Sequence, residues 1–210
     1  MERGKLITVE GIDGSGKTTL VSALVAQLEA RFGIAAKPLR EPGGVDVSER
    51  IRDLLKDPNA TIGGRAEALL YAAARAELID QAVEPLLASG SWVILDRYVD
   101  SSLAYQGAAR GLGIEHVAAI NSFATDGLVP NRTLLLELDP AVARQRSNVR
   151  GEEVDRIEAE GDSFFTAIAD AYSELARAHP DRIRRLDAEL SPDDLLEAAL
   201  GELADLTQEC

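Results

Sequence analysis

The stretch "GIDGSGKTT" at residues 11–19 decides the fold, because it matches the pattern G-x-x-x-x-G-K-[ST] in full. It follows the apolar run "LITV" at residues 6–9 and precedes a segment of helical character. Glycines let the backbone curl so that successive N–H groups point inward, and the positive end of the following helix adds to them. The pattern predicts a phosphate-binding loop between a strand and a helix. A glycine-rich turn that binds no ligand is the alternative.

Two residues at the end of this loop carry its expected chemistry. Lys17 should reach the β- and γ-phosphates of a nucleoside triphosphate as a point charge, and the Thr18 hydroxyl should take a position on magnesium. Asp96 ends the apolar run "WVILD" and is well placed to orient magnesium or its water shell, although it could instead cap the next helix. The residues expected to bind the phosphate donor are Gly11, Ile12, Asp13, Gly14, Ser15, Gly16, Lys17 and Thr18.

Further apolar runs of strand length lie at residues 91–95, 133–138 and 183–186, and they alternate with helical segments. This alternation predicts a parallel sheet covered by helices, in a single α/β domain over residues 1–210. Helix ends are predicted from local signals. These signals are Gly33 and Gly90 as stops, and Asp139 before Pro140 and Ser191 before Pro192 as starts. Residues 40–46 and 148–162 fit no regular element well.

The charge balance limits the classes of ligand. With 36 acidic and 22 basic residues the net charge is -14, which argues against binding a nucleic-acid polymer. A phosphate ligand must then be held by a few locally placed cations. The single cysteine, Cys210, cannot form an internal disulfide, and no stretch reaches 18 consecutive apolar residues. We therefore expect a cytoplasmic protein with no membrane association.

Arginines supply the candidate cations. Those in or beside the segments above are Arg40, Arg75, Arg97, Arg146, Arg150 and Arg156. Guanidinium groups that converge would hold an acceptor phosphate and cover the migrating one, although any single arginine could be a surface ion pair. The two histidines, His116 and His179, look like ordinary surface residues, so no general base is evident. A monophosphate acceptor, with a second pKa of about 6, would need none.

Several motifs occur together and in order: "EGIDGSGKTT", "REPGG", "YAAAR", "ILDRYVDSSLAYQG" and "DRIE". In this combination the chain resembles the bacterial thymidylate kinases, nearly from end to end. The resemblance implies a P-loop NTPase fold of three αβα layers, with a five-stranded parallel sheet and a short lid at about residues 146–161. It also implies ATP-dependent phosphorylation of dTMP to dTDP in dTTP synthesis, with Mg²⁺, by a homodimer. A kinase of another nucleoside monophosphate, or a P-loop regulatory ATPase or switch, is the alternative.

The same resemblance assigns roles around the acceptor. Asp13 would face the acceptor's 3′-hydroxyl and the magnesium shell, which adds it to Thr18 and Asp96 as metal residues. Arg40 and Arg97 would grip the acceptor phosphate. Tyr71 would stack on thymine and Arg75 would hydrogen-bond its edge, whereas Tyr71 by itself reads as a core residue.

The remaining roles concern the sugar and the lid. Tyr105 and Gln106 would lie near the sugar and base, where the tyrosine ring leaves no space for a ribose hydroxyl. Ser102 would make a weaker polar contact to the base. Gly14 and Ser15 place the chain in the branch whose lid supplies the catalytic charge, here from Arg150 and Arg156. An extra acidic residue in "RGEEVDRIE" leaves the register of the lid open. The expected catalytic residues are Lys17, Arg97, Arg150 and Arg156.

Overall fold

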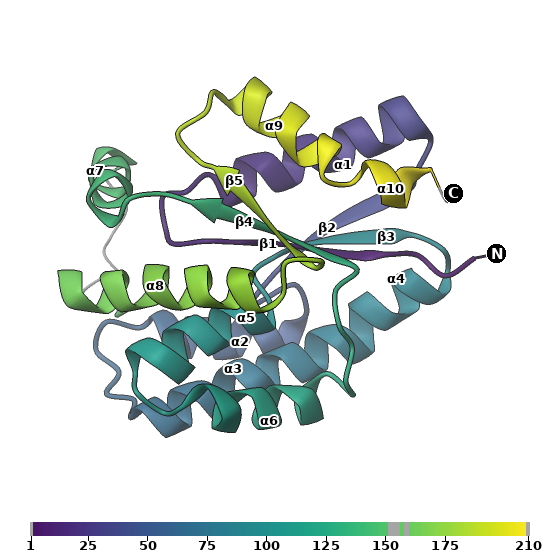
Figure 1. The fold of residues 1–210 in the computed structure, drawn as a ribbon. Helices are drawn as coiled ribbons and strands as arrows, with labels where there is room; N and C mark the ends of the chain where they lie inside the picture. The colour runs from purple at the N-terminus through teal and green to yellow at the C-terminus, as the bar shows by residue number, and fades with distance from the viewer. Residues whose placement is uncertain (1, 151–155, 158–159, 209–210) are drawn as a thin grey trace.

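The centre of the molecule is a five-stranded parallel sheet with the order β2-β3-β1-β4-β5 (Figure 1). This computed structural model describes residues 2–150, 156–157 and 160–208, with the side chains of residues 147–150 also outside the description. The strands are β1 (Leu6–Glu10), β2 (Ala36–Arg40), β3 (Trp92–Asp96), β4 (Arg132–Glu137) and β5 (Ile183–Asp187). The α/β class and the five parallel strands expected from the sequence are confirmed.

Four strands coincide with the apolar runs of the sequence, but β2 has no such run. Its sequence "AKPLR" is mostly exposed and contains Pro38. β2 pairs only with β3, at the edge of the sheet. An edge strand tolerates proline and polar side chains because one side of it carries no ladder of hydrogen bonds. The strand was therefore hidden from a search for apolar runs.

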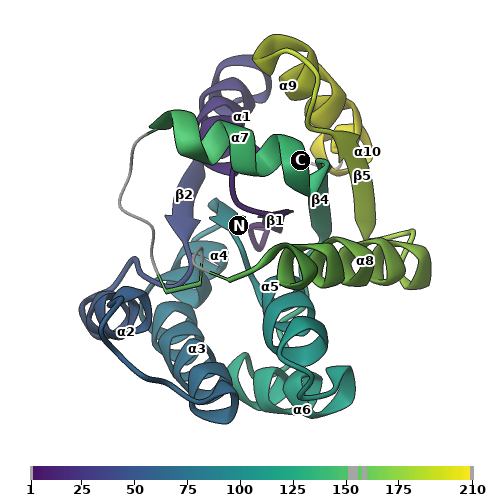
Figure 2. The same cartoon turned by 90° about the vertical axis from the view of Figure 1, so that its left-hand side faces the viewer.

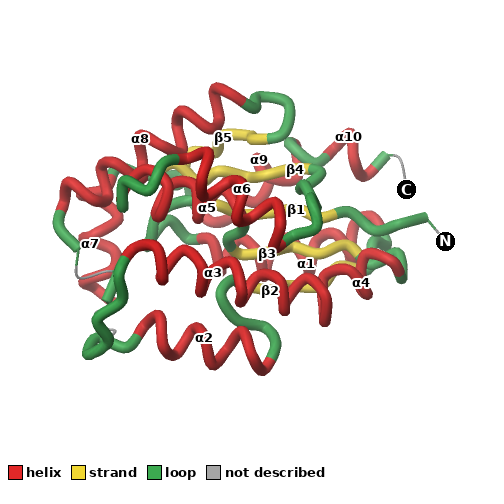
Figure 3. The backbone as a smooth tube through the Cα atoms, turned by 90° about the horizontal axis from the view of Figure 1, so that it is seen from below, coloured by secondary structure: helices red, strands yellow, loops and turns green. Residues whose placement is uncertain are grey.

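Helices cover both faces of the sheet (Figures 1 and 2). One face carries α1 (Lys17–Phe32), α9 (Pro192–Gly201) and α10 (Ala204–Thr207), with α7 (Pro140–Arg150) at its end. The other face carries a thicker layer, which Figure 3 shows from below. Its helices are α2 (Asp46–Lys56), α3 (Gly64–Leu78), α4 (Glu84–Ala88), α5 (Val99–Ser102), α6 (Ile114–Ala124) and α8 (Asp162–Ala178). None of the helices in the described part of the chain is long and apolar enough to cross a membrane.

The predicted helix ends agree with the structure. Gly33 ends α1 in a left-handed conformation and donates to the carbonyls of Leu28 and Glu29. The Asp139 carboxylate accepts from the N–H of Ala141 at the start of α7, and the Ser191 hydroxyl accepts from the N–H of Asp194 at the start of α9. Each is a local cap that satisfies a backbone group with no partner inside the helix.

Two helical stretches contain π-helical turns, which the sequence did not predict. The turn η1 (Ile79–Val83) joins α3 to α4 within the helical segment expected to end at Gly90, and η2 (Leu103–Ala109) continues α5. Such turns occur preferentially at functional sites. Two of the predicted acceptor residues, Tyr105 and Gln106, lie in η2.

The carboxyl ends of three neighbouring strands deliver the predicted site residues to one edge of the sheet. The phosphate loop follows β1, Arg40 ends β2, and Asp96 ends β3. The peptide bond after β2, between Glu41 and Pro42, is cis. In parallel α/β sheets this edge is where ligands bind.

Candidate active site

A cavity of about 980 Å³ opens at this edge and brings most of the predicted residues together. That volume is in the range of small-molecule sites. Its lining includes Ile12, Asp13, Gly14, Gly16, Lys17, Thr18, Arg40, Tyr71, Arg75, Asp96, Arg97, Ser102, Tyr105 and Gln106. The donor and acceptor residues expected from separate motifs thus share one cavity.

The phosphate loop has the backbone that its glycines predict. Gly11, Gly14 and Gly16 have φ values of 140°, 84° and 90°, in the region that disfavours side chains. A Cβ atom at Gly11 would also lie 2.6 Å from the carbonyl oxygen of Leu136, so only glycine fits. The loop ends where α1 begins at Lys17, whose Nζ donates to the carbonyl of Ile12 at 2.9 Å.

Charges in the loop are strongly coupled. Burial, with the nearby charge of Arg97, lowers the pKa of Lys17 to about 8 although Asp13 opposes the shift. Burial acts to raise the pKa of Asp13, but the charges of Arg97 and Lys17 outweigh it and hold that pKa well below its ordinary value. Asp13 therefore stays ionised at neutral pH. A cavity with such shifted groups is a candidate active site.

Thr18 and Asp96 meet at the foot of the loop. The Thr18 hydroxyl donates to Asp96 Oδ2 at 2.9 Å. Within the residues that the structure describes, no three His, Cys, Asp or Glu side chains form a metal cluster. Magnesium in nucleotide sites needs only one or two carboxylates, because phosphate oxygens and water complete its shell. This hydroxyl and carboxylate, with Asp13 nearby, fit such an ion.

Arg97 connects the phosphate loop with the rest of the cavity. Its Nη2 donates to Asp13 Oδ1 at 2.6 Å, and its Nη1 donates to the Gly11 carbonyl at 3.0 Å. The guanidinium lies 5.1 Å from the ring centroid of Tyr105, whose hydroxyl donates to Asp13 Oδ2 at 3.3 Å. The φ of Arg97 is 70°, which is rare for a residue other than glycine. Backbone strain of this kind is concentrated at functional sites.

The family follows once this geometry is compared with known proteins. A family model described as thymidylate kinase matches residues 9–199. The chain belongs to the thymidylate kinase family. Among curated relatives, the thymidylate kinase of Latilactobacillus sakei is 48% identical over 187 residues, covering 88% of this chain and 87% of the relative. That of Halorhodospira halophila is 45% identical over 208 residues, with 98% and 96% covered, and that of Deinococcus radiodurans is 44% identical over 200 residues, with 95% and 96% covered.

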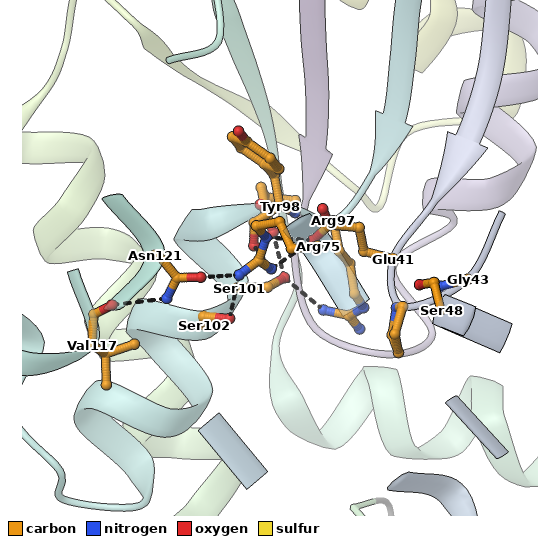
Figure 4. Close-up of polar contacts among 12 residues, drawn as sticks. Glu41, Gly43, Ser48, Arg75, Arg97, Tyr98, Ser101, Ser102, Val117 and Asn121 are labelled. Carbon is orange, nitrogen blue, oxygen red and sulfur yellow. Dashed lines mark hydrogen bonds and ion pairs between the residues drawn. The ribbon is translucent and has the colours of Figure 1, made fainter. Parts of the chain in front are cut away.

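Within this thymidylate kinase fold, Arg75 is held entirely by protein groups (Figure 4). Its side chain is 2% exposed, and its Nε and Nη2 contact Glu41 Oε2 at 2.8 Å and 2.5 Å. Nη1 donates to the Ser102 hydroxyl and to Asn121 Oδ1, and Nη2 donates to the Tyr98 carbonyl. These contacts are four hydrogen bonds and one ion-pair contact, so most of the five N–H groups of the guanidinium have protein partners. That Arg75 hydrogen-bonds a thymine edge stays a prediction, and such a bond would compete with these partners.

Glu41 is the acidic partner of Arg75 and also lines the cavity. Burial raises its pKa to about 7 although Arg75 acts against the shift. Its Oε1 is buried and has no hydrogen-bond partner among the residues that the structure describes. The sequence motif "REPGG" contains this glutamate, but only the tertiary structure pairs it with Arg75.

The predicted lid residues are only partly placed. The side chain of Arg150 lies outside the described residues. Arg156 is bound to helices on the far side of the cavity from the phosphate loop, where Nη1 donates to Glu67 Oε2 at 2.8 Å and Nε to the Leu55 carbonyl at 3.1 Å. Arg146 donates to the carbonyl of Ala188, after β5. The catalytic roles of Arg150 and Arg156 stay predictions.

Three cations that the sequence reasoning missed also line the cavity: Arg52, Lys56 and Arg144. Arg52 and Lys56 lie one turn apart on α2, and Arg52 donates to the carbonyl of Pro42 at 2.8 Å. Arg144 lies on α7 and pairs with Asp162. The spacing of two cations at i and i+4, in the segment that follows "REPGG", was the available signal for α2.

Proposed function

We propose that the protein transfers the γ-phosphoryl group of ATP to the phosphate of dTMP, giving dTDP and ADP as a step of dTTP synthesis. The observation that carries this proposal is the position of Arg97. Its guanidinium donates to Asp13 in the phosphate loop and also lies against the ring of Tyr105 on the acceptor side. A cation between donor and acceptor sites is what phosphoryl transfer between two phosphates requires.

The donor half of the reaction is assigned to the phosphate loop. The N–H groups of residues 11–18 would cradle the phosphates of ATP, and Lys17 would neutralise the β- and γ-phosphates. Thr18, Asp96 and Asp13 would hold magnesium. When bound, the ion neutralises charge that develops on the donor phosphates.

The acceptor half is assigned to the cavity wall formed by α3 and η2. Tyr71 would stack on thymine, Arg75 and Ser102 would contact its edge, and Tyr105 and Gln106 would lie against the sugar and base. Arg40 and Arg97 would hold the acceptor phosphate. Because a monophosphate with a second pKa of about 6 is already anionic at neutral pH, these residues need only align it.

The lid is assigned to about residues 146–161, with Arg150 and Arg156 as its cations. For Arg156 this role means exchanging Glu67 for phosphate oxygens when ATP binds. Closure of the lid would exclude water and so protect ATP from hydrolysis.

We further infer that the protein is a cytoplasmic homodimer of one domain, residues 1–210, per subunit. The helices α3 and α6 pack side by side on the outer side of the thick layer (Figures 1 and 3). They expose Leu69, Ile114 and Phe123, and Phe123 is 91% exposed. Exposed apolar side chains on these two adjacent helices favour a protein partner, and a second copy is the occupant that we assign.

A coupled assay of ADP release tests the activity. ATP and Mg²⁺ are supplied with each of dTMP, dUMP, dGMP, CMP and UMP in turn. Rapid ADP release with dTMP alone is expected. Release with a different monophosphate would assign another kinase activity, and slow release that no acceptor accelerates would assign a regulatory ATPase instead.

A further inference from the structure

Glu10 is a buried carboxylate to which the proposed reaction gives no task. It is the last residue of β1, directly before the phosphate loop, and its side chain is 0% exposed. Oε1 accepts from the backbone N–H of Tyr98 at 2.7 Å. Oε2 accepts from the hydroxyls of Ser101 at 2.5 Å and Tyr172 at 3.0 Å.

Burial of the Glu10 carboxylate is not explained by a gain in folding stability. The ion pairs found among the described residues include none with Glu10, and the charges of Asp100 and Arg97 act on its pKa in opposite directions. Burial and the charge of Asp100 raise its pKa. A buried carboxyl group without a paired cation costs free energy. Groups that the fold bears at such a cost are often functional.

Two of these three hydrogen bonds come from the turn that presents Arg97. The N–H of Arg97 donates to the carbonyl of Val9, the residue before Glu10. Glu10 then holds the next amide, that of Tyr98, and the Ser101 hydroxyl, which in turn accepts from Arg97 Nη1 at 3.2 Å. The end of β1 therefore fixes both the backbone and the side chain of Arg97 through hydrogen bonds.

These hydrogen bonds are needed to hold the strained backbone conformation of Arg97. A φ of 70° at a residue other than glycine costs about 1–3 kcal/mol and persists only where the surroundings impose it. Without its anchors the turn would relax, and the guanidinium would move away from Asp13 and from the space between donor and acceptor. A displacement of about 1 Å is enough to slow a reaction that depends on alignment.

We propose that Glu10 is a positioning residue for phosphoryl transfer, which holds the strained turn at Arg97 through Tyr98 N–H and the Ser101 hydroxyl. This inference rests on the proposed function, because it assumes that Arg97 acts on the phosphates. Glu10 does not line the cavity, and it acts only through Arg97. Tyr172, on α8, supports the carboxylate through its own hydrogen bond to Oε2.

A double-mutant cycle on the full chain tests this proposal. Glu10→Gln preserves shape and one acceptor oxygen but removes the other. With ATP, Mg²⁺ and dTMP, we expect kcat to fall at least about tenfold in the wild-type background, the scale of coupling between residues in one network. In the Arg97→Ala background, the same change should alter the residual kcat by less than about twofold, because there is no longer a guanidinium to position. Equal losses in both backgrounds overturn the proposal.

A matched control comes from Asp100, a buried carboxylate in the same turn that pairs with Arg182 at 2.6 Å. Asp100→Asn should lower the melting temperature and have the same effect on kcat with and without Arg97. If it shows the same dependence on Arg97 as Glu10→Gln, the coupling is not specific to Glu10 and the proposal is wrong.

Two further measurements keep the outcome clear. If Glu10→Gln does not fold, Ser101→Ala takes its place in the cycle, because it removes the hydroxyl between Glu10 and Arg97; additivity there also overturns the proposal. The wild-type enzyme is assayed in parallel with dTMP. If it transfers phosphate while the cycle is additive, Glu10 alone has been misassigned, whereas a wild type that cannot phosphorylate dTMP removes the proposed function itself.

Discussion

At the scale of single residues, Lys17 shows a conflict between stability and function. Its ammonium is buried and lies near the charge of Arg97, so its pKa falls from 10.5 to about 8 on folding. Between these values the unfolded chain binds more protons than the folded one. The stability of the ligand-free protein should therefore rise with pH from about 8 to about 10.5. A charged lysine that lowers the stability of the ligand-free protein is consistent with a site that binds phosphate.

We expect Lys17→Ala to reduce kcat at least about a hundredfold, because it removes a charge aimed at the transferred group. The free energy of unfolding at about pH 7 should change little or increase, and its rise in alkali should disappear. The coupled assay and urea unfolding at two pH values measure these effects. Lys37→Ala, at an exposed position of β2, is the control. A large loss of stability at neutral pH would show that the lysine is structural.

Tyr105 allows a second prediction at this scale, on the choice of sugar. Its ring is buried between Arg97 and the edge of Phe164. Tyr105→Ala should improve kcat/KM for ribo-TMP relative to dTMP, because the ring no longer fills the space beside the 2′ carbon. Tyr105→Phe keeps the ring and loses only the bond to Asp13, so the ratio should stay as in wild type. An unchanged ratio in Tyr105→Ala would remove the ring from sugar discrimination.

At the scale of elements, one carboxylate ties three segments together. Glu67 on α3 is 0% exposed and accepts from Gln106 in η2, from Arg110 directly after η2, and from Arg156 before α8. Arg110 also pairs with Glu160 and lies 4.6 Å from the ring centroid of Phe164. The acceptor wall and the start of α8 are thus joined through a single buried acid.

Removing this acid should be costly, because two partly buried guanidinium groups would lose their shared partner. We expect Glu67→Ala to lower the free energy of unfolding by about 3–5 kcal/mol, the range for breaking one side of a buried ion pair. Urea denaturation measures the change. Glu115→Ala, at an exposed position of α6, should have an effect within about 0.5 kcal/mol. Similar effects from the two variants would mean that the Glu67 cluster contributes no net stability.

At the scale of the whole molecule, the proposed homodimer can be tested through Phe123. In the proposed dimer, the ring of Phe123, which is 91% exposed on α6, would be buried against the other subunit. Phe123→Ser should shift the mass in solution toward the monomer, because it removes apolar area from the contact. Sedimentation velocity at several concentrations measures this shift. Phe32→Ser, on α1 at the opposite face of the sheet, should leave the mass unchanged. A wild type that is monomeric at every concentration would contradict the dimer.

The features that could be derived from the sequence are those specified by neighbouring residues. Three such features are the glycines of the phosphate loop, the helix stop at Gly33 and the helix cap at Asp139. Each acts on backbone groups within a few positions along the chain, so its pattern can be recognised in the sequence alone. The three central strands β1, β3 and β4 were visible because strands buried on both faces are continuously apolar. Most acceptor residues, by contrast, came from the family resemblance, since a lone Tyr71 in an alanine-rich helix looks like core.

What only the tertiary structure decided are pairings between distant segments. Arg75 is bound by Asn121, 46 positions along the chain, and Glu67 by Arg156, 89 positions along. The cations of α2 line the cavity, and Glu10 hydrogen-bonds the turn at Arg97. Neither placement could be predicted from neighbouring residues in the sequence. Long polar side chains have many possible partners, and which one they meet is fixed by how the sheet and its helices pack, because burial makes every unpaired charge expensive.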